Sequence, residues 1–177
     1  VSSAASDVYK RQKSSIILFM VNFNNRQLYF AGSFLCLAMM FYALYAEHYL
    51  LLTPCPLCVL QRIAVTISGI LFLIAAIHNP AKPMSYIYNA LILISSLAGT
   101  GIASWHTWLQ NLPADKVPSC GPGFDYLVGN FPLSDALSLI FSGSGECATI
   151  DWSFMWLSMP TWVAIFCLLL ASMTIFI

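Results

Sequence analysis

Charged side chains are scarce in this sequence. Of its 177 residues, 8% are Asp, Glu, Lys or Arg and 59% are hydrophobic, whereas an ordinary soluble domain carries roughly 25% charged residues. Such a chain has too little charge to cover a surface that faces water, which excludes a soluble globular domain. The net charge is zero and the sequence has no basic patch, which argues against binding to nucleic acid. The surface must instead be solvated by a lipid bilayer.

Four apolar runs are long enough to cross a bilayer, for which about 20 residues are needed. They cover about residues 28–49, 59–77, 86–108 and 161–177. These runs are too long for strands, and helices satisfy their own backbone hydrogen bonds in lipid. The sequence therefore predicts an all-α membrane protein, a single domain of residues 20–177 built as a bundle of four transmembrane helices.

The two ends of the chain differ from this pattern. Residues 1–19 have no apolar periodicity and predict a disordered or non-native segment, with Met20 as a candidate start. No small-residue cleavage site follows the first apolar run, so a cleavable signal peptide is not expected. The fourth run stops at Ile177 without a charged flank, and we expect the natural protein to continue.

The distribution of Lys and Arg predicts the orientation in the membrane, because these residues favour the cytoplasmic side. Arg26 precedes the first predicted helix, and Lys82 lies in the short connection after the second. Both termini are then inside, and two loops face outwards, a short one at about residues 50–58 and a long one at about 109–160. Five tryptophans near the same outer face are expected to anchor it at the lipid headgroups: Trp105, Trp108, Trp152, Trp156 and Trp162.

The long outer loop contains a short amphipathic segment, FPLSDALSLIF. Its residues Leu133, Ala136, Leu137 and Ile140 follow the i, i+3, i+4, i+7 spacing of one helical face. The segment is too short to span a bilayer. We therefore predict a short helix that lies flat on the membrane surface.

The six cysteines divide by location. Cys36 and Cys167 lie within the first and fourth apolar runs, where they are expected to pack as small hydrophobic side chains. The other four all fall in the outer loops: Cys55, Cys58, Cys120 and Cys147. An even number of cysteines in an oxidising compartment predicts two disulfides. By location alone, Cys120 and Cys147 fit an inert structural bridge as well as a redox-active one.

The segment Cys55-Pro56-Leu57-Cys58 favours redox chemistry. Two residues between cysteines close a strained ring that is easily reduced, and such motifs lower the pKa of a thiol. Cys58 is expected at the first turn of the second helix, where the partial positive charge of the helix N-terminus favours a thiolate. The thiolate is the form that attacks disulfides or donates electrons.

Arg62 follows Cys58 by four residues, so the two side chains share one helical face. An arginine at the membrane boundary is costly unless it reaches the headgroups or has a partner. Anchoring in the headgroups is the simplest interpretation of Arg62. Its position on the outer side, one turn from a reactive sulfur, favours a second role, in which it stabilises the thiolate and donates a hydrogen bond to the carbonyl of an electron acceptor.

Four segments resemble the DsbB family (disulfide bond formation protein B): PCPLCVLQR, SWHTWL, PSCGPGFDYLV and SGECATIDWSFMWLSMPTW. The resemblance covers about residues 20–177 and includes all four outer cysteines in the family's order. It implies a thiol:quinone oxidoreductase of the bacterial inner membrane, with both termini cytoplasmic and the redox loops periplasmic. Such a protein oxidises a DsbA-like periplasmic thiol oxidase, passes the electrons to ubiquinone or menaquinone, and so sustains disulfide bond formation.

The resemblance also implies roles for the four outer cysteines. Cys120 and Cys147 would form the disulfide that the reduced partner attacks, and Cys120 would be the sulfur that joins it. Electrons would then pass to Cys55 and Cys58, with Cys147 bridging to Cys55 on the way. Cys58, left as a thiolate, would face the quinone ring.

Two further residues would lie at the quinone if the resemblance holds. Arg62 would hold and polarise it, and His106, at the outer end of the third helix, would lie near the same ring. The chain departs from the familiar family pattern at Gln61, where an acid is usual. We therefore expect Arg62 to lack a neighbouring carboxylate. This departure bears on how the protein tunes the quinone and does not change the expected reaction.

Three alternatives compete with this interpretation. Relatives of vitamin K epoxide reductase also combine four helices, a CxxC motif and a quinone, but their loop cysteines precede the CxxC motif, whereas here they follow it. A metal-binding membrane protein could use the four outer thiolates as a tetrahedral zinc or copper site, although only one pair is closely spaced. A purely structural membrane protein with two stapled loops is the third alternative. The redox enzyme is favoured over all three.

Overall fold

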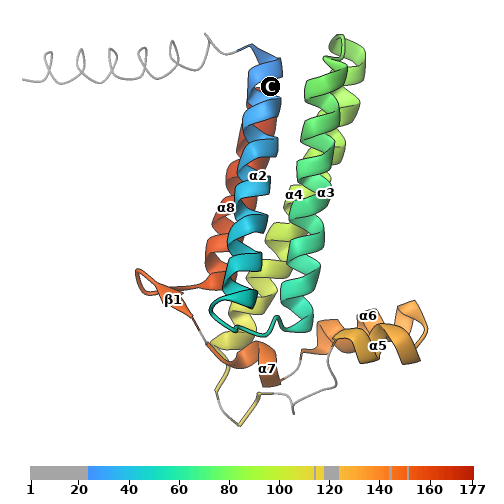
Figure 1. The fold of residues 1–177 in the computed structure, drawn as a ribbon. Coiled ribbons are helices and arrows are strands. Elements are labelled where there is room, and N and C mark those ends of the chain that lie inside the picture. The colour runs from blue at the N-terminus through green and yellow to red at the C-terminus, as the bar shows by residue number, and fades with distance from the viewer. Residues whose placement is uncertain (1–23, 114, 118–123, 144, 151) are drawn as a thin grey trace, which may run out of the picture.

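The computed structural model describes residues 24–113, 115–117, 124–143, 145–150 and 152–177. The expected non-native segment at 1–19, the candidate start Met20 and the loop cysteine Cys120 lie outside these described residues. Four long helices form the body of the described part (Figure 1): α2 (Asn25–His48), α3 (Pro56–His78), α4 (Lys82–Gln110) and α8 (Met159–Phe176). Each is long and apolar enough to cross a membrane, which confirms the predicted four-helix membrane fold.

Prolines account for the earlier starts of α3 and α4. α4 begins at Lys82, four residues before the predicted start, and α3 begins at Pro56, three residues before. In each case a proline occupies the first turn, where a backbone N–H would have no partner within the helix. The earlier start of α3 brings Cys58 inside its first turn.

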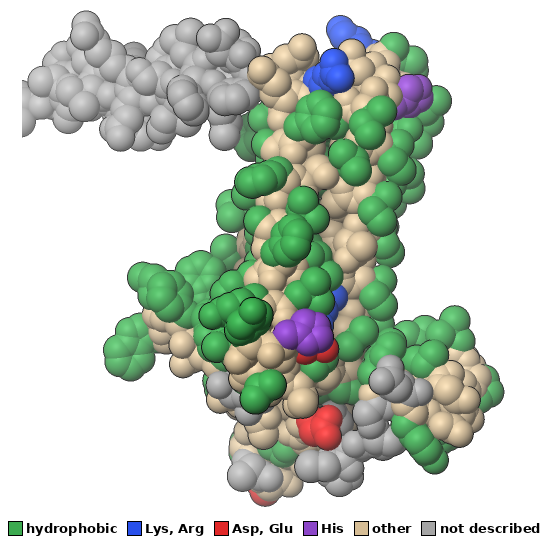
Figure 2. Space-filling view, in the orientation of Figure 1, with side chains coloured by type: hydrophobic (Ala, Val, Ile, Leu, Met, Phe, Trp, Pro, Cys, Tyr) green, Lys and Arg blue, Asp and Glu red, His purple; other side chains and the backbone are tan. Residues whose placement is uncertain are grey.

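The helices pack unevenly around the bundle. α4 packs against both α3 and α8, and α2 packs along α3, whereas α2 and α8 touch at few points. Apolar side chains run along the face of the bundle seen in Figure 2, and many are exposed, among them Phe34, Phe41 and Ile94. These helices therefore turn apolar side chains outward as well as inward, as expected of helices surrounded by lipid.

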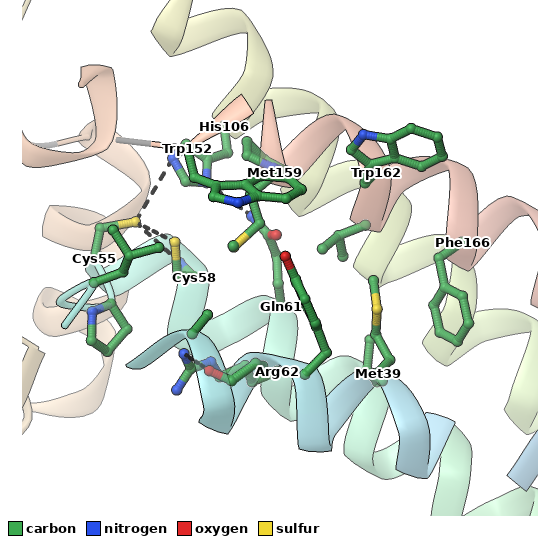
Figure 3. A pocket seen from close by; sticks show the side chains of 18 of the residues that line it. Met39, Cys55, Cys58, Gln61, Arg62, His106, Trp152, Met159, Trp162 and Phe166 are labelled. Atoms are coloured by element: carbon green, nitrogen blue, oxygen red, sulfur yellow. Dashed lines mark hydrogen bonds between the residues drawn. The ribbon is translucent and has the colours of Figure 1, made fainter. Parts of the chain in front are cut away.

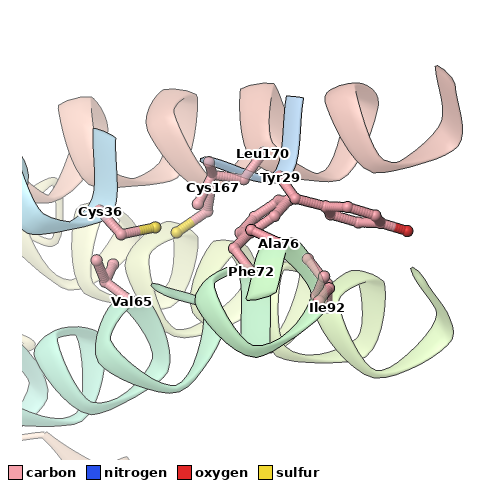
Figure 4. Close-up of a cluster of buried hydrophobic side chains, with 9 residues drawn as sticks. Tyr29, Cys36, Val65, Phe72, Ala76, Ile92, Cys167 and Leu170 are labelled. Atoms are coloured by element: carbon pink, nitrogen blue, oxygen red, sulfur yellow. The ribbon is translucent and has the colours of Figure 1, made fainter. Parts of the chain in front are cut away.

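The interior of the bundle is an apolar cluster in which Cys36 and Cys167 are buried, as predicted (Figure 4). A glycine on a neighbouring helix leaves room for each sulfur-bearing side chain. A Cβ added at Gly69 of α3 would lie 2.8 Å from the Cys36 Cβ, and one added at Gly99 of α4 would lie 2.9 Å from the Cys167 Sγ. Close packing against glycine thus gives both cysteines a structural role, and no redox role is needed to explain their positions.

The long loop folds against the lower end of the bundle in Figure 1. It contains α5 (Phe124–Asn130), α6 (Leu133–Ser142), α7 (Gly145–Ala148) and a short antiparallel hairpin of β1 (Ser153–Phe154) and β2 (Leu157–Ser158). The apolar residues of this end form a second core, separate from the one in the bundle, with members Cys55, Leu57, Leu109, Leu127, Ala136, Ile140 and Cys147. This second core joins the loop to the ends of α3 and α4.

The predicted short helix of the long loop is confirmed as α6, but two residues of its apolar face are covered by protein. Ala136 and Ile140 are buried in the second core, with Leu57 of α3 and Leu109 of α4. Leu133, at the first position of the helix, is exposed. Part of the apolar face therefore packs against protein, and the placement of this helix on the membrane surface stays a prediction.

Replacing Gly99 with alanine is expected to destabilise the bundle. The new Cβ would lie 2.9 Å from the Cys167 Sγ and 3.3 Å from the Ala64 Cβ, and overpacking of this kind costs about 1–3 kcal/mol. Gly101→Ala is the matched control on the same helix, since nothing lies within 4 Å of its added Cβ. Thermal unfolding in detergent should show a lower Tm for Gly99→Ala alone, and equal Tm values for the two variants would contradict this packing.

Candidate redox site

The first turn of α3 holds Cys55 and Cys58 in a fixed relation. Cys55 is the N-cap of the helix, with φ −70° and ψ 162°, and its Sγ accepts a hydrogen bond from the backbone N–H of Cys58 at 3.3 Å. Pro56 favours both features, because a residue before proline is driven to an extended conformation and proline suits the first helical position. The cysteine spacing and the proline thus place both sulfurs at the helix N-terminus.

Cys55 lies between two other cysteines. Its Sγ donates a hydrogen bond to the Cys58 Sγ at 2.9 Å, and its side chain is also hydrogen-bonded to that of Cys147. The hydrogen bonds to Cys147 and Cys58, together with burial, raise the pKa of the Cys55 thiol above its ordinary value. Cys147, from α7 of the long loop, is 1% exposed. The structure therefore brings three of the four predicted redox cysteines together, and Cys120 lies outside the described residues.

His106, on α4, closes the site from the other side. Its Nε2 lies 3.0 Å from the backbone oxygen of Cys147 and 3.7 Å from the Cys55 Sγ, and its Nδ1 lies 3.0 Å from the side-chain nitrogen of Gln61. Both His106 and Gln61 are buried, at 2% and 4% exposed. His106 is thus in contact with the cysteines as well as close to the place expected for a quinone.

Arg62 has a carboxylate partner, contrary to the expectation from the sequence. It forms an ion pair with Glu47 of α2, and its Nη2 donates to the backbone oxygen of Ala43 at 3.3 Å. The expectation was wrong because it considered only the neighbours of Arg62 in sequence. α2 and α3 are joined by a short connection, so the last turns of α2 lie beside the first turns of α3, and the acid comes from the neighbouring helix.

A cavity of about 960 Å³ lies beside these residues, between α2 and α8. Figure 3 shows Cys58, Gln61, Arg62 and His106 at one end and Met39, Trp162 and Phe166 at the other. Tyr42 and Leu169 also line the cavity and are 40% and 61% exposed on the outer surface of their helices. The cavity therefore reaches the lipid-facing surface between α2 and α8, two helices that touch at few points.

Several residues of the site were not singled out from the sequence. No role was predicted for Glu47 from the sequence, and Gln61 stood out only as a departure from the family pattern. Trp152 lines the cavity in the structure, where the sequence predicted only an anchor. The signal for Glu47 was the short connection between the two helices, whereas the Gln61–His106 contact depends on the packing of α3 against α4, which has no sequence signal.

The cluster also has the composition of a metal site. Ligand atoms of Cys55, Cys58 and His106 all lie within 4.8 Å of one another. The His106 Nε2, however, faces a carbonyl oxygen, which only accepts hydrogen bonds, so this nitrogen carries the hydrogen and not a free lone pair. In the arrangement described, the imidazole is engaged as a hydrogen-bond donor.

Comparison with known proteins agrees with this geometry. The family model for "Disulfide bond formation protein DsbB" matches residues 25–177. Proteins named "Disulfide bond formation protein B" are 47% identical over 140 residues in Nitrosococcus oceani, covering 79% of this chain and 83% of the relative, and 44% identical over 146 residues in Chromobacterium violaceum, covering 82% and 88%. The chain therefore belongs to the DsbB family of disulfide bond formation proteins.

Proposed function

We propose that this protein oxidises a DsbA-like thiol oxidase in the periplasm and passes the electrons to a membrane quinone, ubiquinone or menaquinone. The protein would act in the bacterial inner membrane, with both termini cytoplasmic and the redox loops periplasmic. One observation carries the proposal: Cys58, hydrogen-bonded to Cys55, lines an apolar cavity that reaches the lipid-facing surface. A lipid-soluble electron acceptor can enter such a cavity, whereas a water-soluble one is disfavoured there.

The arrangement of the cysteines supports a direction of electron flow. Cys147, on the outer loop, contacts Cys55, and Cys55 contacts Cys58. Cys55 and Cys58 both line the apolar cavity, and Cys58 is half-buried whereas Cys55 is buried. The raised pKa of the Cys55 thiol suits this role. Its sulfur is attacked while it is part of a disulfide, and it takes up a proton when that disulfide is broken. A thiol at this position does not compete with Cys58 for the role of thiolate.

The proposed exchange begins at the loop disulfide. A thiolate of the reduced partner attacks the Cys120–Cys147 disulfide at Cys120, and resolution by the partner's second thiol releases the oxidised partner and leaves two loop thiols. Cys147 then attacks the Cys55–Cys58 disulfide at Cys55, so that a Cys147–Cys55 bond forms and Cys58 leaves as a thiolate. Attack of Cys120 on Cys147 restores the loop disulfide and leaves Cys55 as a thiol.

With Cys58 a thiolate and Cys55 a thiol, the pair must then lose two electrons and one proton to become a disulfide again. A quinone, when bound, supplies the acceptor for both. The cavity fits such a group by the chemistry of its lining, since a guanidinium from Arg62 lies at the sulfur end and apolar side chains, including Met39 and Phe166, lie along the rest. Its volume of about 960 Å³ is at the upper end of the range for ligand pockets, roughly 300–1,000 Å³.

Cys58→Ala should abolish quinone reduction. We would mix the purified protein in detergent with a reduced periplasmic thiol oxidase and follow the absorbance of ubiquinone or menaquinone. Loss of the sulfur that faces the cavity removes the electron donor, so the rate should fall by a factor of at least about 10³, in the range of removing a nucleophile. Cys36→Ala is the matched control, because Cys36 is buried in the bundle core. Turnover by the Cys58 variant at the wild-type rate would rule the proposal out.

Glu47→Gln should weaken quinone binding more than it slows the chemistry. Without its ion pair, Arg62 is held only by the Ala43 carbonyl oxygen. The pair is partly exposed and worth roughly 0.2–1 kcal/mol, so the KM for quinone should rise by up to about fivefold with little change in kcat. Glu146→Gln is the control, since Glu146 lines the same cavity but is not the ion-pair partner of Arg62. An unchanged KM in Glu47→Gln would show that the ion pair does not position the guanidinium.

A thiolate metal site is the alternative that Cys55, Cys58 and His106 admit. The redox proposal expects zinc and copper well below one equivalent after purification without chelator, because the His106 Nε2 is committed to a carbonyl oxygen. Elemental analysis of the purified protein measures this directly. One equivalent of zinc or copper, lost on mutation of His106 or Cys58, would favour the metal-binding function instead.

A further inference from the structure

The position of Cys147 depends on contacts outside its own helix. α7 has only four residues, and so short a helix is not stable in isolation. Two side chains of α4 hold the segment by its backbone: the His106 Nε2 lies 3.0 Å from the Cys147 oxygen, and the Gln110 side chain donates to the Thr149 oxygen at 3.3 Å. His106 and Gln110 are four residues apart and therefore share one face of α4.

The partners of His106 determine where its hydrogen lies. The Cys147 oxygen is a carbonyl and only accepts, so the His106 Nε2 must donate. On the opposite side of the ring, the amide nitrogen of Gln61 lies 3.0 Å from Nδ1 and donates to its lone pair. One chain of hydrogen bonds thus runs from Gln61 on α3 through the neutral imidazole on α4 to the backbone of Cys147 on α7.

This chain of hydrogen bonds gives a physical meaning to glutamine at position 61. A carboxylate accepts hydrogen bonds and cannot donate, so an ionised acid there would call for a hydrogen on Nδ1. The ring would then either release the Cys147 carbonyl or become positively charged beside Cys55, Cys58 and Cys147. Of the other charged groups near this site, Arg62 and Glu47 are paired with each other, and Glu146 also lines the cavity.

We infer that Gln61 and His106 are positioning residues that dock the backbone of Cys147 and so keep its sulfur beside Cys55. The inference deepens the proposed function and rests on it, because electrons leave the loop in the step in which Cys147 attacks Cys55. In this role the imidazole acts as a neutral N–H donor. It need not take up or release a proton.

The test measures the docking without quinone or partner protein. In full-length protein carrying Cys58→Ala and Cys120→Ala, Cys55 and Cys147 remain as the pair at the site. Equilibration with reduced and oxidised glutathione, followed by alkylation and mass analysis, gives the effective concentration of one thiol at the other. His106→Phe keeps a ring but has no N–H, and should lower this concentration about tenfold, as loss of one buried hydrogen bond predicts.

Two companion variants separate docking from other roles of the histidine. His106→Gln restores an N–H donor without an imidazole, and its effective concentration should stay within about threefold of the parent value. Gln61→Met removes the amide, and its effective concentration should be lowered toward that of His106→Phe. Equal values for the parent and His106→Phe would overturn the inference, as would equal losses in His106→Phe and His106→Gln.

A measurement on the unmodified chain covers the case in which a variant does not fold. ¹⁵N NMR of the histidines should show His106 with its hydrogen on Nε2 and a bare Nδ1, and a hydrogen on Nδ1 alone would overturn the inference. Neither measurement involves quinone. Failure of the docking would therefore leave quinone reduction by the wild type intact, while absent quinone reduction with normal docking would count against the proposed function alone.

Discussion

The start of α3 is the constraint on which the rest of the site depends. Pro56 begins the helix and holds Cys55 extended, so that the Cys55 sulfur caps the Cys58 N–H and the two sulfurs lie 2.9 Å apart. One turn later Arg62 follows on the same face of the helix. A shift of the sequence by one residue along this helix would turn Cys58 and Arg62 away from the cavity by about 100°, because each helical residue turns by that angle.

The second constraint is the membrane itself. A redox site that uses a lipid-soluble acceptor needs a route from the bilayer to a sulfur, and a tightly packed bundle of four helices would close that route. Here α4 holds α3 and α8 together while α2 packs along α3, so α2 and α8 are left with few contacts. The cavity lies at that gap, and the Arg62–Glu47 ion pair joins α2 to α3 beside it. The stability of the bundle and access to the site thus come from different helix pairs.

Sequence patterns predict the parts of this structure that depend on local chemistry. Run length and hydropathy predict the four helices, and the cysteine spacing with its proline predicts the position of Cys58 at a helix start. The contacts of Glu47 and Gln61 could not be predicted in the same way, because each joins residues from two helices, and the rotation of one helix against another depends on the whole interface. The helix start of α4 was missed for a local reason, since Pro83 was taken to precede the helix although the first turn accepts it.

The central claim is that the cavity between α2 and α8 holds the quinone beside Cys58. The most direct measurement is labelling of the wild-type protein, under turnover in detergent, with a photoreactive azidoquinone, followed by mapping of the modified peptides. The account predicts labels on cavity-lining residues of α2 and α8, such as Met39 and Phe166, and protection of both by excess ubiquinone or menaquinone. Protectable labelling confined to helices or loops outside this cavity, in a sample that turns over, would contradict it.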